Sequence, residues 1–301
     1  MKDVVTRAKP FVKWAGGKGR LLNEIEVLLP ERFSSSKGIT YVEPFVGGGA
    51  VLFWALHKYT DISHFVISDI NEDLIGTYRA IQQNPCELLS ILKEIESNYI
   101  SKEEDKRKEY FLEKREIFNS KPQDNILNSA LFIFLNKTCF NGLYRVNSKG
   151  KFNVPFGKYE NPKICDEKNI IACHDSLQKV EILQGDFEKT LSYADENTFF
   201  YLDPPYKPIS LTSSFTAYTK EDFSDKDQIR LSEFCDSISS KGSFFILSNS
   251  DVNTIDKKDL FFDKLYSQYS IHRVFTNRMI NSKANRRGLL SELMISNNKI
   301  H

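Results

Sequence analysis

The sequence has few residues of the kinds that build metal centres and disulfide frameworks. Its 301 residues include five cysteines and five histidines, and no two cysteines are spaced as C-x-x-C. The odd number of cysteines argues against a disulfide scaffold, and without H-x-x-x-H pairs or mixed Cys/His sets no zinc site is expected. We therefore expect reduced thiols, a cytoplasmic protein and no bound metal.

Long apolar runs are absent as well. No stretch approaches the ~18 consecutive apolar residues that a membrane-spanning helix requires, and residues 1–10 lack the apolar centre of a secretory signal. Apolar residues make up 41% of the chain and charged residues 27%, which is usual for soluble globular proteins and excludes wholesale disorder. We expect no membrane partner, and the length allows one large domain or two modest ones.

An excess of charge of one sign is the third absence. With 41 Lys and Arg against 40 Asp and Glu, the formal net charge is +1, which by itself argues against a strongly basic nucleic-acid-binding protein. The charges are unevenly placed, however, because residues 1–20, 137–163 and 264–299 hold six, six and seven basic residues with one acid each. These three basic islands either build one positive face for phosphates or are scattered solvated surface, and charge alone does not decide.

Apolar runs alternate with helical patterns along most of the chain. We expect strands at residues 41–45, 64–69, 180–186, 198–203 and 243–248, and helices at residues 20–29, 50–58, 72–82 and 223–240. This alternation is typical of an α/β fold with an open, mostly parallel sheet. Two further apolar segments, residues 270–277 and 289–297, are separated by a basic loop and predict a terminal hairpin.

The middle of the chain interrupts this alternation. Residues 84–164 are first charged and helix-rich and then rich in Gly and Asn. An insertion of this size between the second and third strands predicts a separate helical subdomain. The sheet domain would then consist of residues 1–83 and 165–301.

A glycine-rich loop follows the first predicted strand, in the segment EPFVGGGA at residues 43–50. Glycines let the backbone turn sharply and approach a ligand closely. About 20 residues further on, Asp69 ends the next strand, where an acid suits hydrogen bonds to ribose hydroxyls. The pair indicates a nucleoside-type ligand, and the alternative is a tight strand–helix turn beside a surface Asp.

A second motif, Asp203-Pro204-Pro205-Tyr206, closes a hydrophobic strand. The two prolines make a rigid turn at the strand's carboxyl end, where the sites of α/β proteins lie. The Asp203 carboxylate and the Pro204 carbonyl are both acceptors, so together they suit an exocyclic amine on a base, and Tyr206 suits stacking on a flat ring. The alternative is a proline-rich turn with Asp203 as a helix cap.

A third motif, Lys13-Trp14-Ala15-Gly16-Gly17-Lys18, places glycines between an aromatic residue and two cations. Such a segment can hold a carboxylate or a phosphate. It does not match the G-x-x-x-x-G-K-[ST] loop of nucleotide-binding proteins, since Arg20 stands near the position where a hydroxyl is needed.

In this order, the three motifs resemble those of the Dam-type DNA adenine-N6 methyltransferases, including the GATC-modifying DpnII-type enzymes, over essentially the whole chain. The resemblance implies a Rossmann-like S-adenosylmethionine-dependent methyltransferase sheet with an inserted helical DNA-recognition subdomain and hairpin. The implied cofactor is S-adenosylmethionine, held by Trp14, Lys18, Phe45, Gly47, Gly49, Asp69, Asp186, Phe187 and Asp203. The implied catalytic residues are Asp203, Pro204, Pro205 and Tyr206, with Tyr206 stacked on a flipped adenine.

The insertion also resembles a family feature, the hairpin that recognises the target sequence, at residues 136–145 and 151–159. The resemblance implies DNA contacts from Lys13, Phe140, Asn141, Leu143, Arg145 and Tyr159. Arg suits guanine and Asn suits adenine in the major groove, while Phe140 and Leu143 suit a wedge beside the flipped base. Residues 211–218 also fit the family. Many members have Tyr at the position of Phe140, and Thr138-Cys139 departs from some, so GATC is the expected site rather than a fixed one.

The function predicted from the sequence is site-specific methylation of the N6 amine of adenine in double-stranded DNA by a monomer, with two copies on one DNA site as an alternative. Association with the nucleoid would follow from DNA binding. Two other functions stay open: an amino-group methyltransferase acting on RNA or protein glutamine, and an inactive relative that only binds DNA. The sequence does not distinguish a restriction–modification role from one in replication and repair or in a phage.

Overall fold

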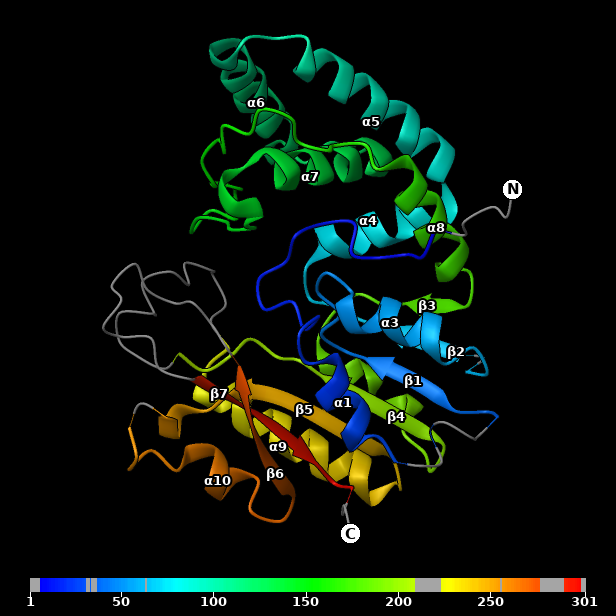
Figure 1. Ribbon diagram of the computed structural model, residues 1–301, viewed down its shortest axis with the longest axis vertical. Coiled ribbons are helices and arrows are strands. Elements are labelled where there is room, and N and C mark those ends of the chain that lie inside the picture. The colour runs from blue at the N-terminus through cyan, green and yellow to red at the C-terminus, as the bar shows by residue number, and fades with distance from the viewer. Residues whose placement is uncertain are drawn as a thin grey trace.

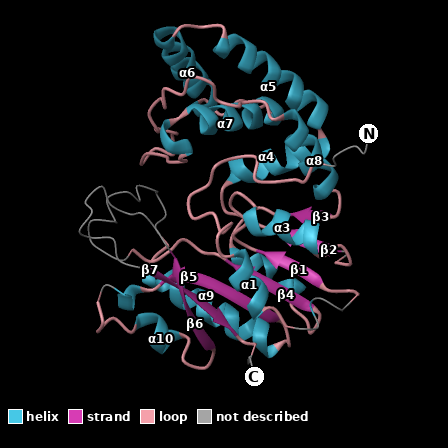
Figure 2. Ribbon diagram, viewed as in Figure 1, coloured by secondary structure: helices cyan, strands magenta, loops and turns pink. Residues whose placement is uncertain are grey.

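A single seven-stranded sheet organises the protein, in the strand order β3-β2-β1-β4-β5-β7-β6. The computed structural model describes residues 6–30, 33, 37–62, 64–208, 223–254, 256–276 and 290–298 (Figures 1 and 2). The strands are β1 Thr40–Glu43, β2 His64–Ile67, β3 Val180–Ile182, β4 Thr198–Leu202, β5 Phe244–Ser250, β6 Ser270–Thr276 and β7 Leu290–Ser296. All pairings are parallel except those of β7, which runs antiparallel to both β5 and β6.

The centre of the sheet is apolar on both faces because helices cover both. All five residues of β4 are buried, as expected for a central parallel strand. Successive side chains point to opposite faces, so Tyr201 joins the cluster that includes α3 and α8, while Phe200 joins the cluster with α9 and α10. The bounds of these helices are α3 Ala50–Lys58, α8 Glu167–Leu177, α9 Asp225–Ser240 and α10 Phe261–Leu265, and the short α1 spans Leu22–Leu28.

A helical layer lies above the sheet in Figure 1. It is formed by α5 Pro85–Ile100, α6 Glu104–Asn119 and α7 Asn125–Thr138, and it rests on α4 Glu72–Gln83 and α8. Leu131 to Leu135 of α7 are all buried and belong to the same apolar cluster as Tyr201 of the sheet. The division predicted at residue 84 falls between α4 and α5, and it stays a prediction because one buried cluster continues across it.

The strands predicted from the sequence are confirmed, with somewhat different ends, and so is the terminal hairpin, which is the β6–β7 pair. The recognition hairpin is less regular than its name suggests. Its antiparallel pairing is limited to two bridges, Cys139 with Phe156 and Val146 with Phe152. Pro155 between them has no N–H to give to a ladder, and its carbonyl instead accepts a hydrogen bond from the Phe140 N–H at 2.8 Å.

Other predictions concern features that are expected to be absent. All five cysteines are free thiols. Within the described ranges, no helix is long and apolar enough to cross a membrane. The same residues contain no cluster of three or more His, Cys, Asp or Glu placed to hold a metal ion.

Candidate active site and DNA-recognition surface

The strand order reverses beside β1, which pairs with β2 on one side and β4 on the other. Open α/β sheets bind ligands at the carboxyl ends of the strands at such a reversal. The glycine loop leaves β1 at this edge and the Asp203-Pro204-Pro205-Tyr206 turn leaves β4. Because β1 and β4 are in register, with Val42 opposite Phe200, the fold brings these two motifs side by side.

The glycine loop is shaped to receive Trp14. Gly47 and Gly49 both have positive φ, at 49° and 75°. A Cβ at Gly47 would lie 2.7 Å from Cδ1 of Trp14, and one at Gly48 would lie 2.9 Å from Trp14 Cβ. A larger residue at either position would displace the indole. Trp14, predicted to lie at the cofactor, therefore packs directly on the loop predicted to bind it.

Asp69 at the end of β2 braces the same loop. Its Oδ2 accepts a hydrogen bond from the Gly47 N–H at 3.0 Å, and its Oδ1 accepts one from the Asn71 N–H at 2.9 Å. Burial raises the pKa of Asp69, and the backbone hydrogen bonds oppose that shift. The spacing from the glycines indicated a ribose ligand but gave no sign of this bracing contact.

A buried cation joins the Lys13–Lys18 segment to the Asp203 turn. The Lys18 ammonium lies 2.6 Å from Asp203 Oδ1 and donates to the Gly16 carbonyl at 2.7 Å. It also lies 4.5 Å from the centre of the Tyr206 ring. The Lys18 side chain is 4% exposed, so this ion pair is shielded from solvent. Three residues predicted for the site, from two separate motifs, thus meet at one point.

Tyr206 has a second contact through its hydroxyl, which donates to Glu292 Oε2 of β7 at 2.8 Å. Burial, followed by the neighbouring charge of Asp203, raises the pKa of Tyr206 well above its ordinary value. The hydroxyl therefore stays protonated and remains a donor. Glu292 is 4% exposed, and its contact with the site was not predicted, because an acid within the run LSELMIS gives no hint of its partner.

Glu43 is a further acid that the sequence did not assign to the site. It ends β1, is buried, and accepts a hydrogen bond from the Tyr41 hydroxyl at 2.7 Å. Burial raises the pKa of Glu43 well above its ordinary value, and the charges of Asp203 and Lys18 also act on it. The sequence did contain a signal, a carboxylate at the end of an otherwise apolar strand. Burial of a carboxylate costs free energy unless the group has a hydrogen-bond partner or a counter-charge.

The segment after β3 contributes one of its two predicted residues to the loop region. Phe187 is buried with its ring centre 5.4 Å from that of Phe45. Asp186 caps the 3-10 helix η2 Phe187–Tyr193 by accepting from the Glu188 N–H. It also accepts a hydrogen bond from Arg230 at 3.2 Å. Phe187 therefore packs against Phe45 of the glycine loop, whereas Asp186 contacts Arg230 of α9.

The recognition hairpin presents two apolar side chains to solvent. Phe140 is 53% exposed and Leu143 is 41% exposed; Phe140 begins the 3-10 turn η1 Phe140–Gly142, and Leu143 follows it. Asn141 between them has φ of 57°, a left-handed conformation that Asn tolerates better than most residues. The turn that exposes both apolar groups depends on this residue.

One buried amide joins the N-terminal motif to this turn. Asn136 Oδ1 accepts from the Lys13 N–H at 2.8 Å, and its Nδ2 donates at 2.9 Å to the carbonyls of both Lys13 and Gly142. The stem of Lys13 packs on Gly142, where a Cβ would lie 2.5 Å from Lys13 Cδ. Asn136 was missed as a functional residue, although a single amide in the apolar run ALFIFLN was a usable signal.

The predicted DNA contacts Lys13, Asn141 and Tyr159 consequently form one surface. The Lys13 ammonium lies 5.2 Å from the centre of the Tyr159 ring, and the Tyr159 hydroxyl accepts from the Asn141 N–H at 3.0 Å. Arg145 lies further along the hairpin, where its Nε donates to Asn153 Oδ1 at 2.7 Å. This bond orients the guanidinium before any DNA is bound.

The first two basic islands also meet in the fold. Lys9 of the first and Lys163 of the second both pair with Asp166, at 3.9 and 2.7 Å. Burial lowers the pKa of Lys137, the charge of Asp166 opposes this shift, and nearby lysines add to it. Arg278, Lys283, Arg286, Arg287 and Lys299 of the third island, and the predicted segment 211–218, lie outside the described residues.

A polar junction links the helical layer to the start of α4. Asp73 is buried and accepts hydrogen bonds from Lys121 at 2.7 Å, Asn128 at 3.1 Å and the Tyr144 hydroxyl at 3.0 Å. The Tyr144 ring stacks on Trp14 at 5.7 Å with an interplanar angle of 25°. The hairpin residue before Arg145 is thereby connected to the glycine loop.

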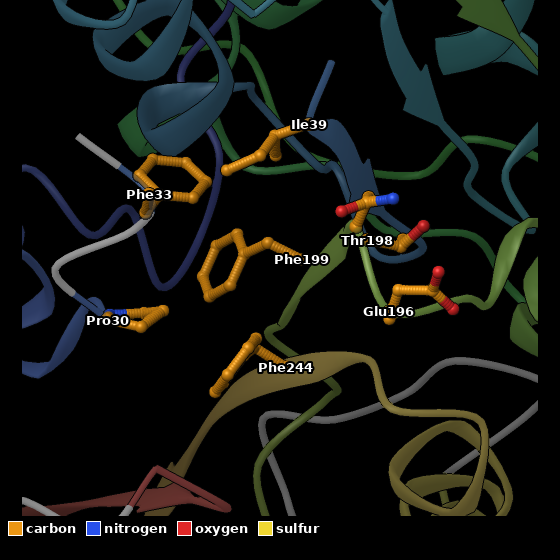
Figure 3. A pocket seen from close by; sticks show the side chains of 8 residues that line it. Pro30, Phe33, Ile39, Glu196, Thr198, Phe199 and Phe244 are labelled. Carbon is orange, nitrogen blue, oxygen red and sulfur yellow. The ribbon is translucent and has the colours of Figure 1, made fainter. Parts of the chain in front are cut away.

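The pocket drawn in Figure 3 lies at the opposite end of the sheet. It is bounded by residues near the amino ends of β1 and β4: Pro30, Phe33, Ile39, Glu196, Asn197, Thr198, Phe199 and Phe244. None of the predicted site residues contributes to it, and it is lined mainly by apolar groups.

A family model, the D12 class N6 adenine-specific DNA methyltransferase, matches residues 14–280. The chain belongs to this family. Among its relatives, the type II methyltransferase M.MjaIII of Methanocaldococcus jannaschii is 48% identical over 96% of this chain and 99% of its own length. The type II methyltransferase M1.LlaDCHI of Lactococcus lactis subsp. cremoris is 37% identical over 96% and 95%. The DNA adenine methylase of Escherichia coli K12 is 32% identical over 95% and 94%.

Family membership confirms three of the predictions made from the sequence. The protein is an enzyme, it methylates adenine N6 in DNA, and its mostly parallel α/β sheet is the Rossmann-like methyltransferase sheet of this family. In this D12-class methyltransferase, the motifs that indicated the family lie together at the switch point of that sheet.

Proposed function

We propose that this enzyme transfers a methyl group from S-adenosylmethionine to the N6 amine of a flipped adenine, within GATC in double-stranded DNA. The convergence of Lys18, Asp203 and Tyr206 beside the glycine loop carries the proposal. We also propose that it acts in the cytoplasm as a monomer.

The residues at the switch point fit S-adenosylmethionine. The charges of Asp69, Asp203 and Lys18 all act on Glu43, which places these two carboxylates and one ammonium around it. Two carboxylates beside one ammonium suit a ligand that carries a positive sulfonium. Trp14, Lys18 and the loop of Phe45, Gly47 and Gly49 would hold it with Asp69, Asp186, Phe187 and Asp203. When bound, the group supplies an electrophilic methyl.

Asp203 and the Pro204 carbonyl make the adenine amine reactive by orienting it. The lone pair of this amine is delocalised into the ring, so the amine is a weak nucleophile. Two acceptors that take its two N–H groups direct the lone pair at the methyl without a strong base. The new N–C bond forms as the S–C bond breaks, and the surplus proton leaves the nitrogen through Asp203 or to solvent.

Lys18 has two tasks in this scheme. Its ammonium balances the charge of Asp203 from 2.6 Å away, and it lies over the Tyr206 ring, on which the adenine stacks. The entering base must therefore share Asp203 with Lys18. Tyr206 provides the flat surface that compensates the base for its lost stacking in the duplex.

The proposed recognition surface selects the DNA site. Lys13, Asn141, Arg145 and Tyr159 would contact the bases and backbone of the site, with Arg145 reading a guanine in the major groove. Phe140 and Leu143, both exposed, would fill the space left in the stack by the flipped adenine. The basic islands would bind the flanking phosphates.

The proposal is tested with a methyl-labelled donor and matched substrates: a GATC duplex, a duplex in which the adenine of the site is replaced, and a single-stranded RNA containing GAUC. Label should appear only in the first, and nucleases that require or are blocked by methylated GATC should then distinguish treated from untreated DNA. Label on RNA or at another DNA sequence would refute the proposed GATC specificity. Tight GATC binding without methyl transfer would refute the proposed reaction.

A further inference from the structure

Two buried amides hold the backbone of the turn that contains Tyr206. Asn249 near the end of β5 and Gln228 on α9 are each 0% exposed. The Lys207 N–H donates to Asn249 Oδ1 at 3.2 Å, Asn249 Nδ2 donates to Gln228 Oε1 at 3.1 Å, and Gln228 Nε2 donates to the Pro205 carbonyl at 3.2 Å. The resulting chain of hydrogen bonds begins and ends on the two peptide groups that flank Tyr206.

The direction of this chain is determined at every step. A backbone N–H can only donate and a carbonyl can only accept, so each amide must keep the orientation that it has here. The next residue strengthens the arrangement, because the Ser250 N–H also donates to Asn249 Oδ1, at 2.9 Å, and the Ser250 hydroxyl donates to the Lys207 carbonyl at 2.7 Å. Rotation of the Gln228 amide would break two hydrogen bonds at once, and rotation of the Asn249 amide would break three.

The packing around Gln228 and Asn249 does not itself require amide side chains. Leu231 and Phe234 of α9 pack with Leu247 of β5 in one apolar cluster, which an apolar residue at position 228 would extend. Buried polar side chains are retained at a cost unless they are fully hydrogen-bonded. Here the bonds that leave the amide pair go to the Asp203 turn and to the adjoining Ser250.

Tyr206 is consequently fixed at three points: the peptide before it, the peptide after it, and its hydroxyl on Glu292. We propose that Gln228 and Asn249 are positioning residues for methyl transfer, which set the Tyr206 ring and the adjoining acceptors so that the target amine points at the methyl group. This inference rests on the proposed role of the turn. The amide pair acts through Tyr206 and contacts neither substrate nor cofactor.

The test compares Gln228→Met and Asn249→Ala with a matched control, Gln82→Met. Gln82 also donates to two backbone carbonyls, those of Leu177 at 2.7 Å and Val180 at 2.8 Å, but it lies at the junction of α4, α8 and β3. The loss of hydrogen bonds is therefore comparable while the site is untouched. Melting temperature, affinity for S-adenosylmethionine and for duplex DNA, and the single-turnover rate of methyl transfer are measured for all.

The two site variants should lose about tenfold to a hundredfold in the single-turnover rate, because small misplacements of a reacting group cost that much. Affinities should stay within about twofold of native, and the control should lose only melting temperature. A duplex with 2-aminopurine at the target position should show altered fluorescence when bound to the site variants but not to the control, since the base stacks on a displaced ring. The double variant should be no slower than the slower single variant, because the amides act in series.

Single-turnover rates within about twofold of native in folded variants would overturn the inference, as would an equal loss in the control. If Gln228→Met does not fold, Asn249→Asp serves instead: its carboxylate still accepts from Lys207 and Ser250 but has no N–H for Gln228. A slower single-turnover rate supports the inference, and a native rate refutes it. If the native enzyme methylates a sequence other than GATC, the proposed specificity is wrong and the same variants are compared on that sequence.

Discussion

The catalytic turn and the recognition hairpin are held in opposite ways. Around Tyr206, the anchoring side chains come from α9, β5 and β7, and Gln228, Asn249 and Glu292 are all buried. The hairpin is anchored by Asn136, by Asn119 and through the Tyr144 hydroxyl on Asp73, yet it leaves Phe140 53% exposed. Under the proposed roles, the groups that meet a reacting atom are fixed in advance, and the apolar groups that meet DNA are exposed.

A physical reason underlies the contrast. Methyl transfer needs the amine and the methyl aligned before reaction, and any freedom of the turn lowers the rate. In the proposed function, the hairpin gains its remaining contacts from the base edges and phosphates of the DNA itself. Perturbing the first region should therefore change the rate, and perturbing the second should change which DNA is chosen.

The largest effect is expected from Asp203→Ala. Loss of the carboxylate removes an acceptor for the target amine and leaves the buried Lys18 ammonium without its partner at 2.6 Å. Methyl transfer should fall by at least about a hundredfold, while duplex affinity, measured by fluorescence anisotropy, changes little. Near-native turnover would remove Asp203 from the mechanism and with it the contrast between the two regions.

Arg145→Ala should act on selectivity instead. Its guanidinium is oriented by Asn153 at 2.7 Å, and a bidentate contact to guanine contributes about 1–3 kcal/mol of discrimination. Relative kcat/KM on duplexes substituted at each position of the site should become more even at one guanine. Unchanged kcat/KM ratios on all substituted duplexes would mean that a residue other than Arg145 recognises that guanine.

Asn136→Ala should weaken the base of the hairpin and leave the catalytic turn intact. Three hydrogen bonds to Lys13 and Gly142 are lost. Because backbone groups are then left without partners, the free energy of unfolding should fall by about 2 kcal/mol. Chemical denaturation measures that loss. Affinity for GATC DNA should fall, whereas affinity of the free enzyme for S-adenosylmethionine should not. A fall in both would mean that the two regions are not separately held.

The smallest expected effect is a pH dependence of stability that arises from Glu43 in the catalytic region. Burial raises the pKa of Glu43 in the folded protein, so the folded state keeps a proton that the unfolded state loses. Stability should then decrease as pH rises above the unfolded value of about 4.3, by at most about 1.4 kcal/mol per pH unit. Glu43→Gln should flatten this slope in thermal melts at pH values above about 4.3. An identical slope in native and variant proteins would show that Glu43 is ionised in the folded state.

Much of the architecture followed from local pattern. The run at residues 198–202 is continuously apolar and is a fully buried central strand, and glycine and proline marked where β1 and β4 end. Because carboxyl ends of neighbouring parallel strands share one edge of a sheet, placing the two motifs there was enough to predict that they meet.

The contacts that hold the site were not predictable in the same way. Glu292 reaches Tyr206 only because β7 is inserted antiparallel beside β5, and Asn249 looks like any polar end of a strand until its partner Gln228 is known. Asn136 and Lys13 are 123 residues apart. Such pairs depend on which elements become neighbours, which periodicity does not encode.

The hydrogen bond between Tyr206 and Glu292 has a consequence for biogenesis. It joins residues 86 positions apart, and Glu292 belongs to β7, the last strand in the chain. The contacts among Lys13, Asn136, Asn141 and Tyr159 are complete much earlier in the chain. Since chains emerge from the ribosome amino end first and fold as segments become available, the contacts of the hairpin can form in a nascent molecule before the Tyr206–Glu292 hydrogen bond. The full set of contacts that holds Tyr206 is therefore complete only after β7 has left the ribosome.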